Sequence, residues 1–105
     1  MRERLQYLSG VLRDCGEVVS AARVEDAISG SEDELDAFLT SNELWGGAGS
    51  IADQAGMGRG SRTEDTRKIE HALIQLGKEQ IRAGKVNVRT ETWVSVFEKW
   101  EKAGI

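Results

Sequence analysis

The chain has 105 residues, of which 39% are hydrophobic and 30% are charged, and its formal net charge is −4 at pH 7. This length and composition favour one folded domain over residues 1–105 and exclude an intrinsically disordered tail. Net acidity disfavours nucleic acid as a partner because phosphate binding needs a basic surface, and no apolar run approaches the roughly 20 residues that span a membrane.

The N-terminal residues Met1–Arg4 lead into no apolar segment of the kind that directs export. The single cysteine, Cys15, has no intramolecular disulfide partner, and its position on an apolar helical face predicts a buried small side chain. We therefore expect a cytoplasmic protein.

Apolar residues recur at intervals of three and four along the N-terminal part of the chain: Leu5, Leu8, Leu12, Cys15 and Val19. This spacing puts them on one face of a helix, and it predicts a first helix over residues 3–22. Gly16 lies inside that span and is the position where such a helix could bend or end early. A short helical turn then leads to Gly30, a residue typical of the position just after a helix.

Ser31 and Glu34 have the spacing of a capping box, in which each side chain bonds the backbone of the other residue. Acidic residues in the same turn suit the positive end of the helix dipole. We predict a second helix over residues 32–41.

A glycine-rich apolar bend, Leu44–Asp53, separates this helix from the C-terminal half of the chain. Its glycines permit a tight or left-handed path, Ser50 has the side chain of a helix cap, and a short helix should follow from Ile51 to Ala55. The residues assigned to this structural bend are Gly46, Gly47, Gly49, Ser50 and Asp53. Replacement of Gly46 or Gly47 by valine should therefore cost stability.

After a glycine-rich connection at 56–60, Ser61 and Glu64 form a second potential capping box, and the clearest helical pattern of the chain covers residues 62–83. Residues 85–89 alternate weakly and should form a loop. Thr90 is expected to cap a last helix that ends at Gly104. The pattern predicts an all-α fold, a compact bundle of four or five helices around the glycine-rich bend.

Chemical sites are sparse in this sequence. Gly47–Ala52 matches a loose dinucleotide fingerprint but follows a helix instead of a strand, so a structural turn explains it better. With one histidine and one cysteine we expect no metal site, no cofactor and no catalytic residue. An alternative is a small ligand-binding or hydrolytic domain with a pocket at Trp45–Asp53, which would require Ser50, Asp53 and His71 to converge.

The strongest functional signal is a run of six carboxylates within residues 25–36, a segment that contains no lysine or arginine. Such a run can dock a basic partner, because complementary charge increases the association rate and the specificity. The residues predicted to bind a partner are Glu25, Asp26, Glu32, Asp33, Asp36 and, as an aromatic anchor, Trp45.

The eleven residues Glu43–Asp53, with the sequence Glu-Leu-Trp-Gly-Gly-Ala-Gly-Ser-Ile-Ala-Asp, resemble a motif of small uncharacterised bacterial proteins. Some of those proteins are similar to immunity proteins that are encoded beside polymorphic toxins. The resemblance implies a role in binding and neutralising a partner protein, for which a basic toxin such as a nuclease would suit the acidic run. It implies no catalytic residue, and the oligomeric state stays open.

Overall fold

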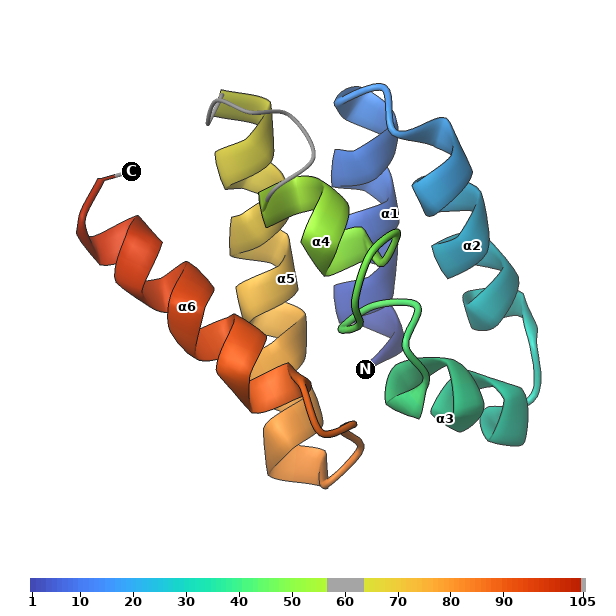
Figure 1. The fold of residues 1–105 in the computed structure, drawn as a ribbon. Coiled ribbons are helices and arrows are strands. Elements are labelled where there is room, and N and C mark those ends of the chain that lie inside the picture. Colours follow the sequence, from blue (N-terminus) through green and yellow to red (C-terminus); the bar gives the residue numbers. More distant parts are fainter. Residues whose placement is uncertain (57–63, 105) are drawn as a thin grey trace.

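The computed structural model describes residues 1–56 and 64–104. These residues form six α-helices and contain no strand (Figure 1). The all-α prediction is confirmed, with a helix count above the predicted four or five. Within these ranges no helix is long and apolar enough to cross a membrane. The helices are α1 (Arg2–Asp14), α2 (Val18–Ser29), α3 (Glu32–Thr40), α4 (Ile51–Gly56), α5 (Glu64–Ala83) and α6 (Thr90–Lys102).

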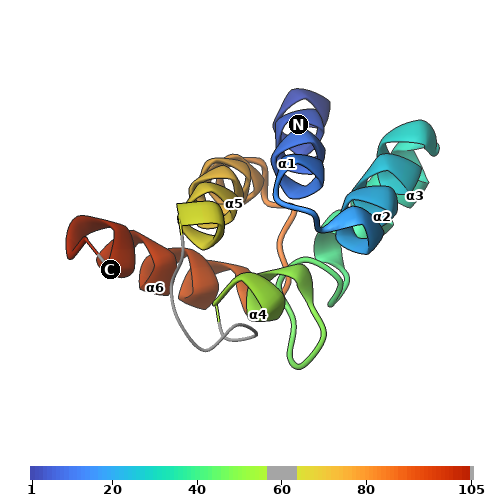
Figure 2. The ribbon, with the colours of Figure 1, turned by 90° about the horizontal axis from the view of Figure 1, so that it is seen from above.

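Four helices lie side by side across Figure 1 in the order α2, α1, α5 and α6, and α4 packs on α5. The view from above in Figure 2 shows α2 and α3 at one edge of the bundle and α6 at the other. The Cα radius of gyration is 12.5 Å. A compact domain of this length has a radius of about 13 Å, so the helices share one core.

The predicted helix over residues 3–22 is wrong, because the chain breaks into α1 and α2 at Gly16. Gly16 has a φ of +81°, which is in the left-handed region. The N–H of Glu17 donates to the carbonyl of Leu12 over 2.8 Å, and the N–H of Gly16 donates to that of Arg13 over 3.0 Å. These two bonds are a Schellman motif, which satisfies the last carbonyls of α1 and ends the helix.

This break changes which side chains are buried. The predicted apolar face of α1 is confirmed, since Leu5, Leu8 and Leu12 are buried. Val19 was expected on the same face but is 70% exposed, because α2 starts in a new direction and buries Ala21 and Val24 instead.

Local capping was predictable at α3. The Ser31 hydroxyl accepts from the Glu34 N–H, and the Glu34 carboxylate accepts from the Ser31 N–H, each over 3.2 Å. This confirms the first capping box, and α3 ends at Thr40, one residue before the predicted end. The second box at Ser61, and the connection at 57–60, lie outside the described residues.

Residues 84–89 form the predicted loop between α5 and α6. Thr90 does not cap α6 as expected. It is the first residue of the helix and is fully buried, with its hydroxyl bonded to the Asn87 side chain over 3.1 Å. The side chain of Asn87, which also accepts from the Arg89 N–H over 2.8 Å, therefore orders the turn that enters α6.

Aromatic side chains of α6 pack toward the glycine-rich bend. The ring of Phe97 lies 6.2 Å from that of Trp45 and 5.2 Å from that of Trp93, measured between centroids. Such tilted pairs add to the stabilisation from burial. The largest fully buried apolar side chains are Leu5, Leu8, Leu12, Leu39, Leu44, Trp45, Ile51, Leu73, Ile74, Leu76 and Phe97.

Candidate functional site

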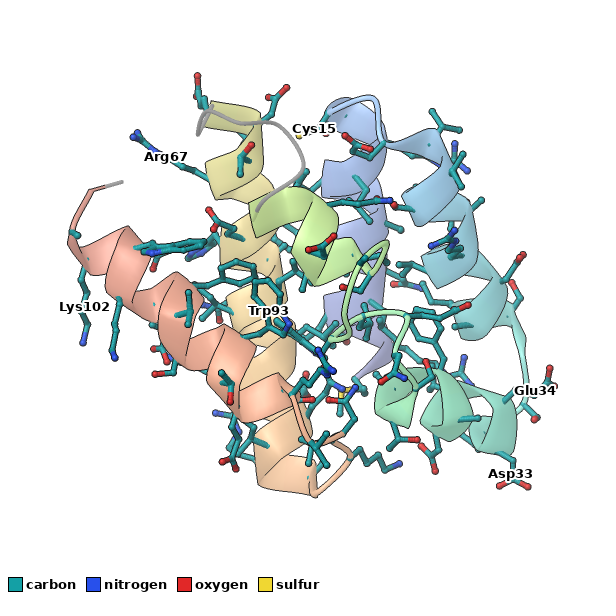
Figure 3. The ribbon with its side chains drawn as sticks, in the orientation of Figure 1. Cys15, Asp33, Glu34, Arg67, Trp93 and Lys102 are labelled. Carbon is teal, nitrogen blue, oxygen red and sulfur yellow. The ribbon has the colours of Figure 1, made fainter. Side chains whose placement is uncertain are left out.

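The acidic segment, residues 25–36, covers the C-terminal turns of α2 and the N-terminal turns of α3. Figure 3 shows Asp33 and Glu34 pointing outward from α3, at the opposite side of the molecule from Arg67 and Lys102. The two helices carry six carboxylates and a single basic residue, Arg23. The fold thus concentrates negative charge at one edge of the bundle.

Cations from distant parts of the chain neutralise three of these carboxylates. Arg13 of α1 holds Glu25 with two hydrogen bonds, one of them 2.7 Å long. Arg2 binds the Glu32 carboxylate at 2.9 Å. Lys85, in the loop after α5, binds Asp36 at 2.7 Å. The segment is therefore less negative in the folded molecule than it is in the sequence.

Two of these ion pairs shift the pKa of at least one of their members. The hydrogen bonds from Arg13 lower the pKa of Glu25, and in return the pKa of Arg13 is raised. The hydrogen bond to Asp36 raises the pKa of Lys85. These shifts keep Glu25, Arg13 and Lys85 charged at neutral pH.

Two carboxylates of the segment, those of Asp26 and Asp33, make no hydrogen bond or ion pair with any part of the chain that the structure describes. Both residues are exposed. Glu34 differs, because its carboxylate accepts from the Ser31 N–H. Asp26 and Asp33 are consequently the members of the segment that can bind a cation without breaking an internal contact.

Trp45 does not belong to an exposed surface. It has no exposed area, and its indole N–H donates to Oε1 of Gln80 over 2.8 Å. The expectation that Trp45 anchors a partner therefore needs correction, because a side chain buried in the core cannot contact another protein without unfolding of the bend.

The bend has the geometry of a structural turn. A Cβ at Gly46 would lie 2.2 Å from the carbonyl oxygen of Asn42, and Gly49 has a φ of +88°. Ser50 Oγ accepts from the Asp53 N–H, and Asp53 Oδ2 accepts from the Gly49 N–H, each over 3.1 Å. Gly47 is exposed, and a Cβ there would meet only the end of a flexible arginine side chain at 3.6 Å.

The described contacts do not bring Ser50, Asp53 and His71 together. Ser50 is buried, and its Oγ accepts from the Asp53 N–H at the start of α4, while the Asp53 carboxylate accepts from the Gly49 N–H. His71 is half exposed on α5, and its Nδ1 lies 2.9 Å from a carboxylate oxygen of Glu101 on α6. Ser50 and Asp53 thus stabilise the start of α4, and His71 contributes to the contact between α5 and α6. The described contacts do not pair Ser50 as a nucleophile with His71 as its base.

Cys15 is only partly buried, in contrast to the buried position expected for it. Burial raises the pKa of its thiol, and its Sγ lies 3.8 Å from the carbonyl oxygen of Asp65. It lines a hollow of about 10 Å³, which has room for one water molecule and not for a metabolite. The described residues contain no group of three or more side chains that could hold a metal ion.

Sequence reasoning missed two polar residues that fix the bend. Gln80 is fully buried in α5, and Asn87 donates from Nδ2 to the carbonyls of Ser41 at 2.8 Å and Trp45 at 2.6 Å. The spacing of Gln80 in the sequence could have indicated this role. It continues the row of buried Leu73 and Leu76 on α5, and a polar side chain buried there needs internal hydrogen-bond partners.

With this geometry, the chain defines a small helical domain with an acidic edge and an internally hydrogen-bonded bend. Comparisons with protein-family models, curated proteins and solved structures found no match.

Proposed function

We propose that this chain is a non-enzymatic protein-interaction domain that binds a basic partner protein through its acidic segment. The observation that supports this best is the exposure of Asp26 and Asp33 without an internal cation in the described chain. A basic side chain can bind these carboxylates with no competing contact to displace, and their field steers a cationic partner toward this edge.

The neutralised members of the segment support the same role. Glu32 and Arg2 form an exposed ion pair, with 74% and 37% of the two side chains accessible. Such a pair contributes little to stability because water screens it. Glu32 can thus exchange Arg2 for a cation of the partner at small cost, as can Asp36, which is 43% exposed beside Lys85.

The resemblance of Glu43–Asp53 to a motif of immunity-like proteins makes the proposal more specific. We propose that the domain binds a toxin and thereby neutralises it. The bend itself then acts as a scaffold, because Trp45 is buried and the exposed charge lies on α2 and α3. The partner would be a basic protein, for example a nuclease, in a cytoplasmic setting.

The test uses the protein encoded by the adjacent gene, which is where a toxin neutralised by an immunity protein is expected. Calorimetric titration at 50 and 300 mM NaCl should give binding that weakens at the higher salt, since exposed charges are screened over a Debye length of about 10 Å at 0.1 M. The double variant Asp26→Lys/Asp33→Lys should bind at least about tenfold more weakly at low salt and lose most of the salt dependence.

The matched control is Glu43→Lys/Glu91→Lys. Both glutamates are exposed, lie outside the acidic segment and have no internal ion pair in the described chain, and the net charge changes by the same amount. This control should bind within about twofold of the unmodified chain. Equal weakening by the two double variants, or no binding at all, contradicts the proposal.

A further inference from the structure

The first turn of α2 exposes two adjacent apolar side chains that the fold does not use. Val18 is 54% and Val19 is 70% exposed, whereas Val24 further along the same helix is fully buried. A β-branched side chain lowers helix propensity, and at an exposed position it gains no burial in return. The stability of the isolated chain therefore does not explain these valines.

The valines begin a stripe along the outward side of α2. At about 100° per residue, Val19, Ala22 and Asp26 project away from the side that buries Ala21 and Val24. Helix α2 lies at the edge of the bundle in both ribbon views (Figures 1 and 2). Val19, Ala22 and Asp26 are all exposed on it. The stripe changes from apolar to acidic over the about 12 Å that separate residues 18 and 26 in a helix.

A second copy of this chain fits the stripe poorly. A two-fold axis across the middle of the stripe would pair the helices antiparallel and place Asp26 of each copy against Val19 of the other. A two-fold axis along the helices would bring the two Asp26 carboxylates together, which is repulsive. In addition, each copy carries a formal charge of −4.

We propose that the stripe Val18, Val19, Ala22 and Asp26 is the contact surface for the basic partner, and that the partner presents an apolar side chain about 12 Å from a lysine or arginine. The inference rests on the proposed function and adds the apolar half of the contact. Charge complementarity at Asp26 selects the basic residue, and the valines supply the surface that leaves water on binding. Arg23 lies at the border of the stripe. Its positive charge disfavours a second basic residue of the partner on the Arg23 side of the stripe.

The test is the variant Val18→Ala/Val19→Ala, titrated against the same adjacent-gene protein at 50 and 300 mM NaCl. Alanine keeps the helix, since its helix propensity exceeds that of valine, so the variant should retain its helical circular dichroism. Loss of the apolar contact should weaken binding about tenfold or more at both salt concentrations, with the ratio between the two salts unchanged. Val88→Ala, at a valine that is 94% exposed outside the stripe, should bind like the unmodified chain.

The outcomes separate this inference from the proposed function. If salt-sensitive binding exists but the valine double variant binds as tightly as Val88→Ala, the apolar contact is wrong and the acidic contact stands. If nothing binds, both fail. Sedimentation of the chain alone gives its mass in solution, and a dimer that the double variant dissociates would assign the stripe to a second copy and overturn the inference.

Discussion

The indole N–H of Trp45 donates to the side-chain oxygen of Gln80 over 2.8 Å, and neither residue has exposed surface. The amide nitrogen of the same glutamine donates to the carbonyls of Leu39 and Lys85, each at 3.0 Å. One side chain of α5 thus joins the bend, the end of α3 and the loop that follows α5. A buried polar network of this kind stabilises one arrangement of the chain because every partner is satisfied.

Replacement of Gln80 by leucine should destabilise the domain by about 2 to 4 kcal/mol, because it leaves a buried indole N–H and two carbonyls without partners. The free energy of unfolding in urea, followed by helical circular dichroism, measures this loss. Gln75→Leu is the matched control, since Gln75 is on the same helix but only half buried, and it should change stability by less than about 0.5 kcal/mol. An equal effect of the two substitutions would contradict the role assigned to Gln80.

Gly77 sits where α5 approaches α6 and the bend. A Cβ there would lie 2.4 Å from Cγ2 of Val94 and 3.0 Å from a ring carbon of Trp45. Gly77→Ala should cost about 1 to 2 kcal/mol, because the overpacking outweighs the gain of about 1 kcal/mol in helix propensity. Gly10→Ala, with nothing within 4 Å of its Cβ, should instead stabilise by about 0.5 to 1 kcal/mol. Thermal unfolding of the two variants checks this opposite sign.

The elements that sequence predicted best are those that local bonds determine. The capping box of Ser31 and Glu34 fixes the start of α3 within four residues of chain, and the 3.6-residue pattern of α5 is strong over many turns. The break at Gly16 was harder, because a left-handed glycine competes with a helical pattern that runs through it. The pattern alone does not decide whether a continuous helix or a break at Gly16 has the lower free energy.

The candidate site depends on long-range contacts, which the sequence does not contain. The acidic segment has no internal lysine or arginine, yet Arg2, Arg13 and Lys85 reach it from other elements. Trp45 looked like an exposed anchor beside glycines, and its contacts with Gln80, 35 positions along the chain, and with Phe97 place it in the core. Packing decides such positions, whereas the exposure of Asp33 in the first turn of α3 agrees with its pattern.

The two adjacent glycines of the bend should respond differently to alanine, whereas the sequence predicted a loss of stability for valine at either position. At Gly46 a Cβ would lie 2.2 Å from a backbone oxygen of Asn42, so the backbone must shift and the cost should be about 2 kcal/mol or more. At Gly47 the nearest atom is the end of the Arg89 side chain at 3.6 Å, and the change should stay below about 0.5 kcal/mol. Urea unfolding of both variants measures the difference, and similar losses would refute it.

The ion pair of Glu25 and Arg13 should make stability depend on pH in a defined window. Hydrogen bonds from Arg13 lower the pKa of Glu25 below its ordinary value of 4.5. The folded-state pKa is therefore lower than the unfolded one, so the pair stabilises the fold above pH 4.5, and this stabilisation is lost as the pH falls through the folded-state pKa. Glu25→Gln should accordingly be less stable than the unmodified chain at pH 7 and equal to it in strong acid.

Urea unfolding at a series of pH values from 2 to 7 measures this difference. Arg13→Gln removes the same pair from the other side and should give the same pH dependence, and the double variant should lose no more than either single variant at pH 7. A stability difference between Glu25→Gln and the unmodified chain that stays constant across the series would show that the pair contributes nothing through ionisation. Additive losses in the double variant would show that the two side chains act independently of each other.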